Sequence, residues 1–196
     1  MVKLILASAS PRRSEILFNA GFSFDVEPSA FDEGAVDPLS MPPHALAQYL
    51  AMKKAEEVAA RYPDSVVLAA DTFIAHEGQI MGKPHTPQEA SRMLRELSGR
   101  THSVITGYAI VHLSARREIV HSVESRVTFK VLTPEDIDQY IATGEPLDKA
   151  GAYAIQGIGA ALVERLDGDL SNVIGLPLDA VAVDLASLGI KPTPTV

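Results

Sequence analysis

The start of the chain constrains the fold most, because it joins a short apolar run directly to an amphipathic run. Residues 4–7 predict a buried strand, and Pro11 suits the first turn of the helix that follows. Four polar residues stand at or just after the junction: Ser8, Ser10, Arg12 and Arg13. Free backbone N–H groups and guanidiniums favour a bound phosphate there, although such a turn is also an ordinary connection in α/β proteins.

Composition limits the classes of protein that remain. The chain has 196 residues, of which 46% are hydrophobic, so we expect one domain with a sizeable core. A net charge of −8 argues against nucleic acid or an anionic membrane as partner, so a polyanion needs a local cationic pocket with a metal ion. The absence of cysteine excludes disulfides, thiolate metal sites and cysteine nucleophiles, and is compatible with the cytosol. We also expect no signal peptide and no membrane span.

Apolar β-rich runs alternate with helical runs along the chain. Strands are expected at residues 3–7, 22–28, 65–74 and 160–166, with an antiparallel hairpin of 102–113 and 118–132 and a hairpin turn at 77–79. Helices are expected at residues 11–20, 43–61, 86–97, 133–144 and 177–188, and Thr86 with Glu89 predicts a capping box. This order implies a mixed sheet flanked by helices rather than a purely parallel one.

Two acidic positions are candidates for chemistry. Asp71 follows a continuous apolar run, and α/β sheets bind ligands beyond their strand ends, so its carboxylate suits a metal or a water molecule. The alternative is a helix cap or a turn residue. Glu33, next to Asp32, lies in the loop after the second predicted strand and could supply a second oxygen ligand for Mg²⁺, although paired acids in loops are commonly just solvated.

The remaining candidates are basic or amide side chains. Lys83 follows Gly82 in a tight turn that is not a Walker A loop, because Pro84 stands where Ser or Thr is required. Lys53 and Lys54 lie together on the long predicted helix, and the sequence does not decide which of them faces a ligand. Gln156 could read a base edge, because its amide both donates and accepts hydrogen bonds.

Several separate motifs, in order and across nearly the whole chain, resemble the Maf family of nucleoside triphosphate pyrophosphatases. They are Leu6-Ala7-Ser8-Ala9-Ser10-Pro11-Arg12-Arg13, Ala70-Asp71-Thr72, Gly82-Lys83-Pro84, Leu97-Ser98-Gly99-Arg100-Thr101-His102, Gly151-Ala152-Tyr153-Ala154-Ile155-Gln156-Gly157 and Val173-Ile174-Gly175-Leu176-Pro177-Leu178. The resemblance implies an elongated α/β fold similar to inosine triphosphatase, with residues 1–196 as a single Maf-like (Ham1-like) domain of two lobes around a central cleft. It also implies a homodimer.

The same resemblance implies roles for individual residues. Asp71 matches the family's proposed general base, and with Glu33 it matches the acids that hold a divalent cation, Mg²⁺ or Mn²⁺. The expected phosphate-side residues are Ser8, Ser10, Arg13, Lys53 and Lys83. Arg12, Thr72 and Gln156 match the residues of the dTTP/UTP subgroup, whereas the subgroup preferring 7-methyl-GTP has Trp, Gln and Glu at those positions.

The expected function is therefore a cytoplasmic, metal-dependent pyrophosphatase. It would convert dTTP and UTP, or modified pyrimidine triphosphates, to the monophosphate and pyrophosphate, with no nucleic acid or membrane as partner. Two alternatives stay open. One is a nucleotide-binding regulator of septum formation that acts through a partner, and the other is a 7-methyl-GTP pyrophosphatase.

Overall fold

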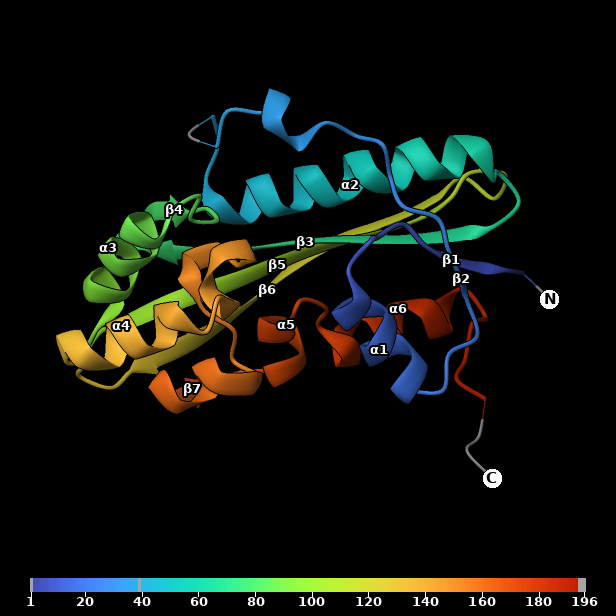
Figure 1. The fold of residues 1–196 in the computed structure, drawn as a ribbon. Helices are drawn as coiled ribbons and strands as arrows, with labels where there is room; N and C mark the ends of the chain where they lie inside the picture. Colours follow the sequence, from blue (N-terminus) through green and yellow to red (C-terminus); the bar gives the residue numbers. More distant parts are fainter. Residues whose placement is uncertain (1, 39, 194–196) are drawn as a thin grey trace. The chain divides into compact units, whose positions relative to one another are not determined.

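The structure is a computed structural model that describes residues 2–38 and 40–193. Within them, strands form a mixed sheet in the order β2-β1-β3-β5-β6-β7, with β4 paired to β3 (Figure 1). The strands are β1 (Leu4–Leu6), β2 (Asp25–Val26), β3 (Val66–His76), β4 (Gln79–Met81), β5 (Thr101–His112), β6 (Arg117–Phe129) and β7 (Val163–Asp167). The helices are α1 (Pro11–Asn19), α2 (Pro43–Arg61), α3 (Pro87–Leu97), α4 (Pro134–Ala142), α5 (Leu170–Ile174) and α6 (Leu178–Ser187), and short 3₁₀ turns are η1 (Glu33–Ala35), η2 (Glu145–Asp148), η3 (Ala150–Ala152) and η4 (Gly157–Leu162). The expected mixed α/β class is confirmed.

The chain groups into two compact units that share three strands. Unit 1 comprises the described residues of Met1–Thr72, Thr106–Val123 and Gly175–Val196, and unit 2 comprises Phe73–Ile105 and Glu124–Ile174. Strands β3, β5 and β6 each contribute residues to both units. Each unit has its own core and is described by itself.

In unit 1, helices cover both faces of the sheet. Strand β1 runs parallel to β2 and β3, with Leu6 opposite both Val26 and Leu68. Because successive strand residues point to opposite faces, β3 presents Val67 and Ala69 to α2 and Leu68 and Ala70 to the other face. Figure 1 shows α2 on one side of the strands and α1 and α6 on the other.

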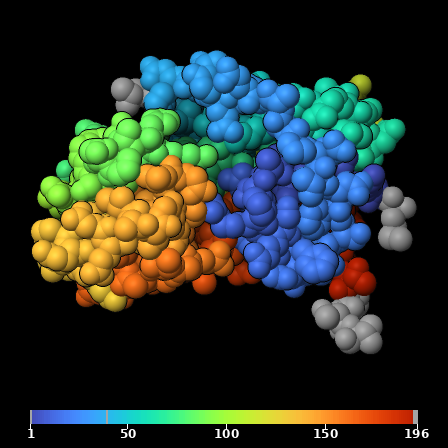
Figure 2. Space-filling model, viewed as in Figure 1, coloured from blue at the N-terminus to red at the C-terminus, as the bar shows by residue number. Residues whose placement is uncertain are grey.

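The segment between β2 and α2 lies along the outer side of α2. The Ala30 backbone N–H donates to the Glu57 carboxylate, and Arg61 donates to the carbonyl of Pro28. In Figure 2 this segment, in lighter blue, covers part of the teal surface of α2. The contacts bring Glu33, at the start of η1, over α2.

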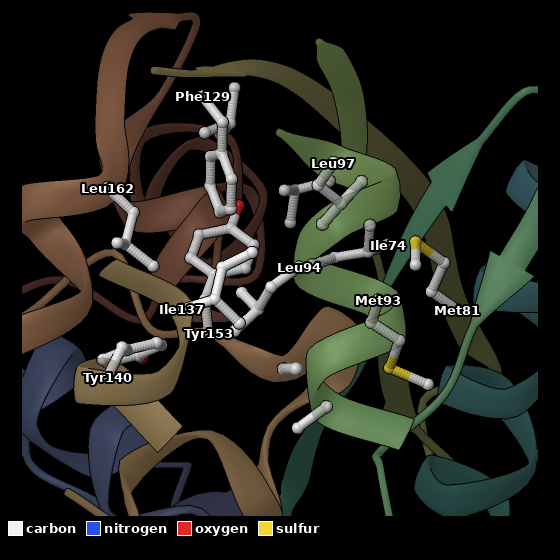
Figure 3. Close-up of a cluster of buried hydrophobic side chains, with 14 residues drawn as sticks. Ile74, Met81, Met93, Leu94, Leu97, Phe129, Ile137, Tyr140, Tyr153 and Leu162 are labelled. Atoms are coloured by element: carbon white, nitrogen blue, oxygen red, sulfur yellow. The ribbon is translucent and has the colours of Figure 1, made fainter. Parts of the chain in front are cut away.

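In unit 2, an aromatic and aliphatic core forms between helices and strand ends (Figure 3). Helix α3 contributes Met93, Leu94 and Leu97, and α4 contributes Ile137 and Tyr140. The rings of His102, Phe129 and Tyr153 meet edge to face, with centroids 4.7–5.3 Å apart. Such contacts add to the free energy gained from burying the rings.

Most predicted elements are present, and the differences have physical reasons. Strand β2 keeps two of seven expected residues, because β1, its partner, is itself only three residues long. Strand β7 begins at Val163, since η4 occupies the preceding residues, and α5 was not predicted. The hairpin β3–β4 occurs as predicted, and β5 and β6 are hydrogen-bonded neighbours as expected.

The capping box expected at Thr86 is only half formed. Thr86 accepts a hydrogen bond from the Glu89 N–H, but the Glu89 carboxylate accepts from the N–H of His85 instead of that of Thr86. The complete box occurs at α4, between Thr133 and Asp136. Helix starts were thus predictable, although the reciprocal hydrogen bond was not.

Candidate functional site

Three charged side chains from three elements meet in unit 1. The Asp71 carboxylate lies 2.5 Å from the Lys54 ammonium, which lies 2.6 Å from the Glu33 carboxylate. Asp71 and Lys54 are buried at 8% and 7% exposure, whereas Glu33 remains half exposed. Buried charges are costly unless they are paired, so Asp71 and Lys54 depend on each other.

Asp71 was expected at the end of a strand, but in the structure it lies well before the end of one. Strand β3 continues to His76, five residues beyond it. Its parallel neighbour β1 stops at Leu6, opposite Leu68, so the residues after β1 lie beside the middle of β3. The alternation that points Val67 and Ala69 at α2 also points Asp71 at α2, and hence at Lys54.

Lys54, rather than Lys53, is the lysine of this cluster. Neighbouring residues on a helix point about 100° apart, so only one of the two can face the sheet. The Lys53 ammonium bonds Glu56 at 2.7 Å and lies over the Tyr49 ring. Lys53 was expected at the phosphates, and that role stays a prediction, but it is Lys54 that lies beside Asp71.

Arg13 fastens three segments of unit 1 together beside this cluster. Its Nε donates to the Gly175 carbonyl at 2.8 Å, and its two terminal nitrogens donate to Ser8 Oγ and Thr72 Oγ1, each at 3.2 Å. Burial lowers the pKa of Arg13, and the charges of Asp71 and Glu33 oppose that shift. The guanidinium therefore holds these segments together by hydrogen bonds and also places a buried positive charge near the carboxylates.

Thr72 is held on several sides through its hydroxyl. Besides Arg13, Oγ1 lies 2.9 Å from the hydroxyl of Thr106 and 3.4 Å from the Gly175 carbonyl. Thr106 is fully buried. Thr106 was not predicted, although a hydroxyl inside the apolar run of β5 could have marked it.

The serines stand at the N-terminus of α1. Ser8 Oγ accepts a hydrogen bond from the Ser10 N–H at 3.2 Å, and Ser10 is the N-cap residue of α1. The Ser10 side chain makes no capping hydrogen bond. Arg12, in the first turn, is exposed. Phosphate binding at this helix start stays a prediction.

Lys83 and Gln156 belong to unit 2. Lys83 is exposed in the turn after β4, and the carbonyl of Gly82 before it accepts a hydrogen bond from the Gly151 N–H. Gln156 is exposed between η3 and η4. This hydrogen bond connects the turn that carries Lys83 to the segment that leads to Gln156.

A family model described as Maf-like protein matches residues 3–188. This chain belongs to the Maf family. A dTTP/UTP pyrophosphatase of Moorella thermoacetica is 52% identical over 97% of each chain, and one of Gloeobacter violaceus is 50% identical over 94% of each. Among solved structures, a HAM1 protein from Coxiella burnetii matches with a TM-score of 0.44 and 17% identity, covering 66% of this chain and 73% of that one.

The acidic pair of this Maf protein fits a magnesium-type ion. Within residues 2–38 and 40–193, no group of three or more His, Cys, Asp or Glu side chains is arranged to hold a metal. Mg²⁺ commonly takes only one or two carboxylates, with substrate phosphate oxygens and water completing its shell. Asp71 and Glu33 both lie within 2.6 Å of one ammonium nitrogen, so together they already hold a cation.

Among the helices described, none is both long and apolar enough to cross a membrane.

Proposed function

We propose that this Maf protein is a cytoplasmic, metal-dependent enzyme that hydrolyses dTTP and UTP to the monophosphate and pyrophosphate. The observation that carries the proposal is the meeting of Asp71 and Glu33 at the Lys54 ammonium. The substrate class is supported by the names of relatives about half identical to this chain. Arg12, Thr72 and Gln156, which match the pyrimidine subgroup, support it as well.

Asp71 is assigned to the attacking water. Water attacks the α-phosphorus, the bond from that phosphorus to the bridging oxygen breaks, and pyrophosphate leaves with the bonding electrons. The Asp71 carboxylate orients the water and accepts its proton as the new P–O bond forms. A carboxylate paired with the Lys54 ammonium, close to the Arg13 guanidinium, is suited to that task.

The cations of the site are assigned to the charge that develops on the phosphates. Lys54, Arg13 and Lys83 stabilise that charge, and Ser8 with the N-terminus of α1 supplies hydrogen-bond donors. A divalent ion held by Asp71 and Glu33 would neutralise phosphate oxygens when bound. Lys54 can then exchange a carboxylate partner for a phosphate oxygen, because all three of its N–H donors rotate freely.

Base selection is assigned to Thr72, Arg12 and Gln156. The Gln156 amide can pair with the edge of uracil or thymine, which presents carbonyl acceptors and an N–H donor. Thr72 is fastened by Arg13 and Thr106, so its hydroxyl has a defined direction. A site built to pair a polar edge discriminates strongly against an analogue that leaves those groups unpaired.

A nucleotide panel with product identification tests the proposal. We expect the purified protein with Mg²⁺ or Mn²⁺ to release pyrophosphate from dTTP and UTP faster than from CTP, GTP or 7-methyl-GTP, and a chelator to abolish the reaction. Release of orthophosphate would contradict the reaction, and preference for 7-methyl-GTP would contradict the substrate.

The Asp71→Asn variant separates catalysis from a regulatory role. Because amide nitrogen cannot accept the proton, we expect kcat to fall by at least about 10²–10³-fold. Any effect of the protein on cell division should disappear with hydrolysis. A variant that is inactive in the tube but retains a cellular effect would favour the regulator instead.

A further inference from the structure

The segment that carries Gln156 is closed on itself in unit 2. Gln156 and Gly157 are exposed, whereas the flanking residues Tyr153 and Gly159 are buried. A Cβ on Gly159 would lie 2.4 Å from the Ala154 carbonyl oxygen, so the two ends of residues 154–159 are in contact. Gln156 therefore stands at the outer part of a short closed loop.

One carboxylate holds the second end of this loop. Glu145, at the start of η2, accepts hydrogen bonds from the Ile158 N–H at 3.1 Å and from the Gly159 N–H at 3.5 Å. The Cα of Gly157 is also close, because a Cβ there would lie 3.1 Å from the same carboxylate. Three consecutive residues after Gln156 thus wrap around the Glu145 side chain.

The first end of the loop is held through Tyr140. The Ala154 N–H donates to the Tyr140 hydroxyl at 3.2 Å. Burial, together with the charge of Glu145 and a hydrogen bond to it, raises the pKa of Tyr140 to about 12. The hydroxyl therefore keeps its proton at neutral pH and can donate it to Glu145 while accepting from Ala154. Both ends of the loop are connected to one carboxylate, directly on one side and through Tyr140 on the other.

We propose that Glu145 is a positioning residue for base selection, which fixes the direction in which Gln156 presents its amide. The inference rests on the proposed function, in which Gln156 reads the pyrimidine edge. An amide on a loosely held loop would contact uracil and cytosine in alternative ways. A loop fastened at both ends limits the orientations of the Gln156 amide. A cytosine edge that does not match that orientation then leaves polar groups unpaired, which costs binding free energy.

UTP and CTP provide the test, because their bases differ at the edge that an amide reads. The measurement is the ratio of kcat/KM for UTP to that for CTP in the wild type, Glu145→Ala, Gln156→Ala and the double variant. We expect each single variant to lower the ratio about tenfold. The double variant should lower it no further than Gln156→Ala does, because Glu145 acts through Gln156. A merely structural loss would lower both kcat/KM values alike and leave the ratio unchanged.

Two matched variants sharpen the result. Glu145→Gln keeps an acceptor oxygen at the same reach and should recover part of the selectivity that Glu145→Ala loses. Glu135→Gln removes a charge from an exposed position on α4 and should leave the ratio within about twofold of the wild type. Circular dichroism and urea unfolding establish that each variant is folded. If Glu145→Ala does not fold, Tyr140→Phe removes only the hydroxyl that holds Ala154 and takes its place.

The outcomes separate this inference from the proposed function. A wild type that releases no pyrophosphate from UTP overturns the proposed function and this inference with it. A wild type that hydrolyses UTP selectively, with an unchanged ratio in folded Glu145→Ala, overturns the inference alone. If the double variant lowered the UTP/CTP ratio by the product of the two single-variant losses, the inference would also be overturned. Such a result would show that Glu145 acts independently of Gln156.

Discussion

The two units each bury a polar pair, and the pairs differ in charge. In unit 1, Lys54 and Asp71 form a buried ion pair 2.5 Å long. In unit 2, the His102 imidazole and the Tyr153 hydroxyl form a buried hydrogen bond of 2.7 Å. Burial lowers the pKa of His102 to about 4, with a smaller contribution from His76, and raises that of Tyr153, so this pair is neutral at pH 7.

The difference shows in which unit this chain accepts the free-energy cost of burying ionised side chains. Ionised side chains lose much of their hydration when buried, and a well-packed neutral core is often at least as stable. Unit 2 keeps its polar pair neutral among aromatic rings, as stability alone would favour. Unit 1 keeps charges that packing does not require, and the proton transfer and phosphate binding proposed for them would be a reason to keep them.

The largest effect is expected from a substitution that breaks the Lys54–Asp71 ion pair and leaves Lys53, the next residue on α2, unchanged. Lys54→Gln leaves Asp71 and Glu33 without their shared cation, and we expect kcat/KM for UTP to fall about 10²-fold or more. Lys53→Gln removes the same charge one residue away and should change kcat/KM less than about twofold, because Lys53 pairs with Glu56. Steady-state kinetics of the two folded variants decides between them. Equal losses would mean that burial against Asp71 does not identify the functional lysine.

The neutral His102–Tyr153 pair should make the stability of the fold depend on pH. His102 titrates near 6.5 when unfolded and at about 4 when folded, so between these values the unfolded chain binds the proton more tightly. Stability is therefore full above about pH 6.5 and is lost as the pH falls toward 4. The loss from this group is about 3 kcal/mol in total.

Urea unfolding at several pH values measures this loss. His102→Gln removes the titrating group and keeps a polar side chain, so it should be less stable at pH 7 but lose less stability between pH 6.5 and 4 than the wild type. Parallel pH profiles for the two proteins would show that His102 is not held neutral by the fold.

A smaller effect is expected where α2 approaches the sheet. A Cβ on Gly107 of β5 would lie 2.2 Å from the backbone carbon of Ala47. Gly107→Ala must therefore shift α2, at an overpacking cost of about 1–3 kcal/mol. Because α2 also carries Lys54, kcat should fall as well. Thermal unfolding and kinetics together test this, and a variant that loses stability at unchanged kcat would separate the packing of α2 from the ion pair.

Sequence reasoning succeeded where the information is local and failed where it depends on pairing. Helix α2 and the β5–β6 hairpin follow from periodicity and turns over a dozen or more residues. The position of Ser8 and Arg13 at the junction of β1 and α1 was predictable, because Pro11 marks a helix start. Which of Lys53 and Lys54 lies beside Asp71 depends on which side of α2 meets the sheet, and the sequence alone does not show that.

Other residues depended on contacts between distant segments. Thr106 lies 34 residues from Thr72 in sequence, and only the alignment of β5 with β3 brings their hydroxyls together. The loop that Glu145 closes has no hydrophobic periodicity, so its hydrogen bonds could not be predicted from the sequence and are known only from the structure. The extent of β3 beyond Asp71 was underestimated for the same reason, because its end is set by pairing with β4.

The smallest effect concerns two threonine pairs on β5. Thr106 and Thr72 lie 2.9 Å apart in the buried network of Arg13, and Thr101 and Thr128 lie 2.8 Å apart on an exposed surface. Thr106→Val keeps the shape but removes the hydroxyl that helps to fix Thr72, at a cost of about 1 kcal/mol. We expect kcat/KM for dTTP to fall a few-fold, whereas Thr101→Val, which loses a hydroxyl pair in contact with water, should change it less than about twofold. If both variants behave alike in activity and in urea unfolding, then the Thr106 hydroxyl supports only packing, and Arg13 and the Gly175 carbonyl suffice to set the direction of the Thr72 side chain.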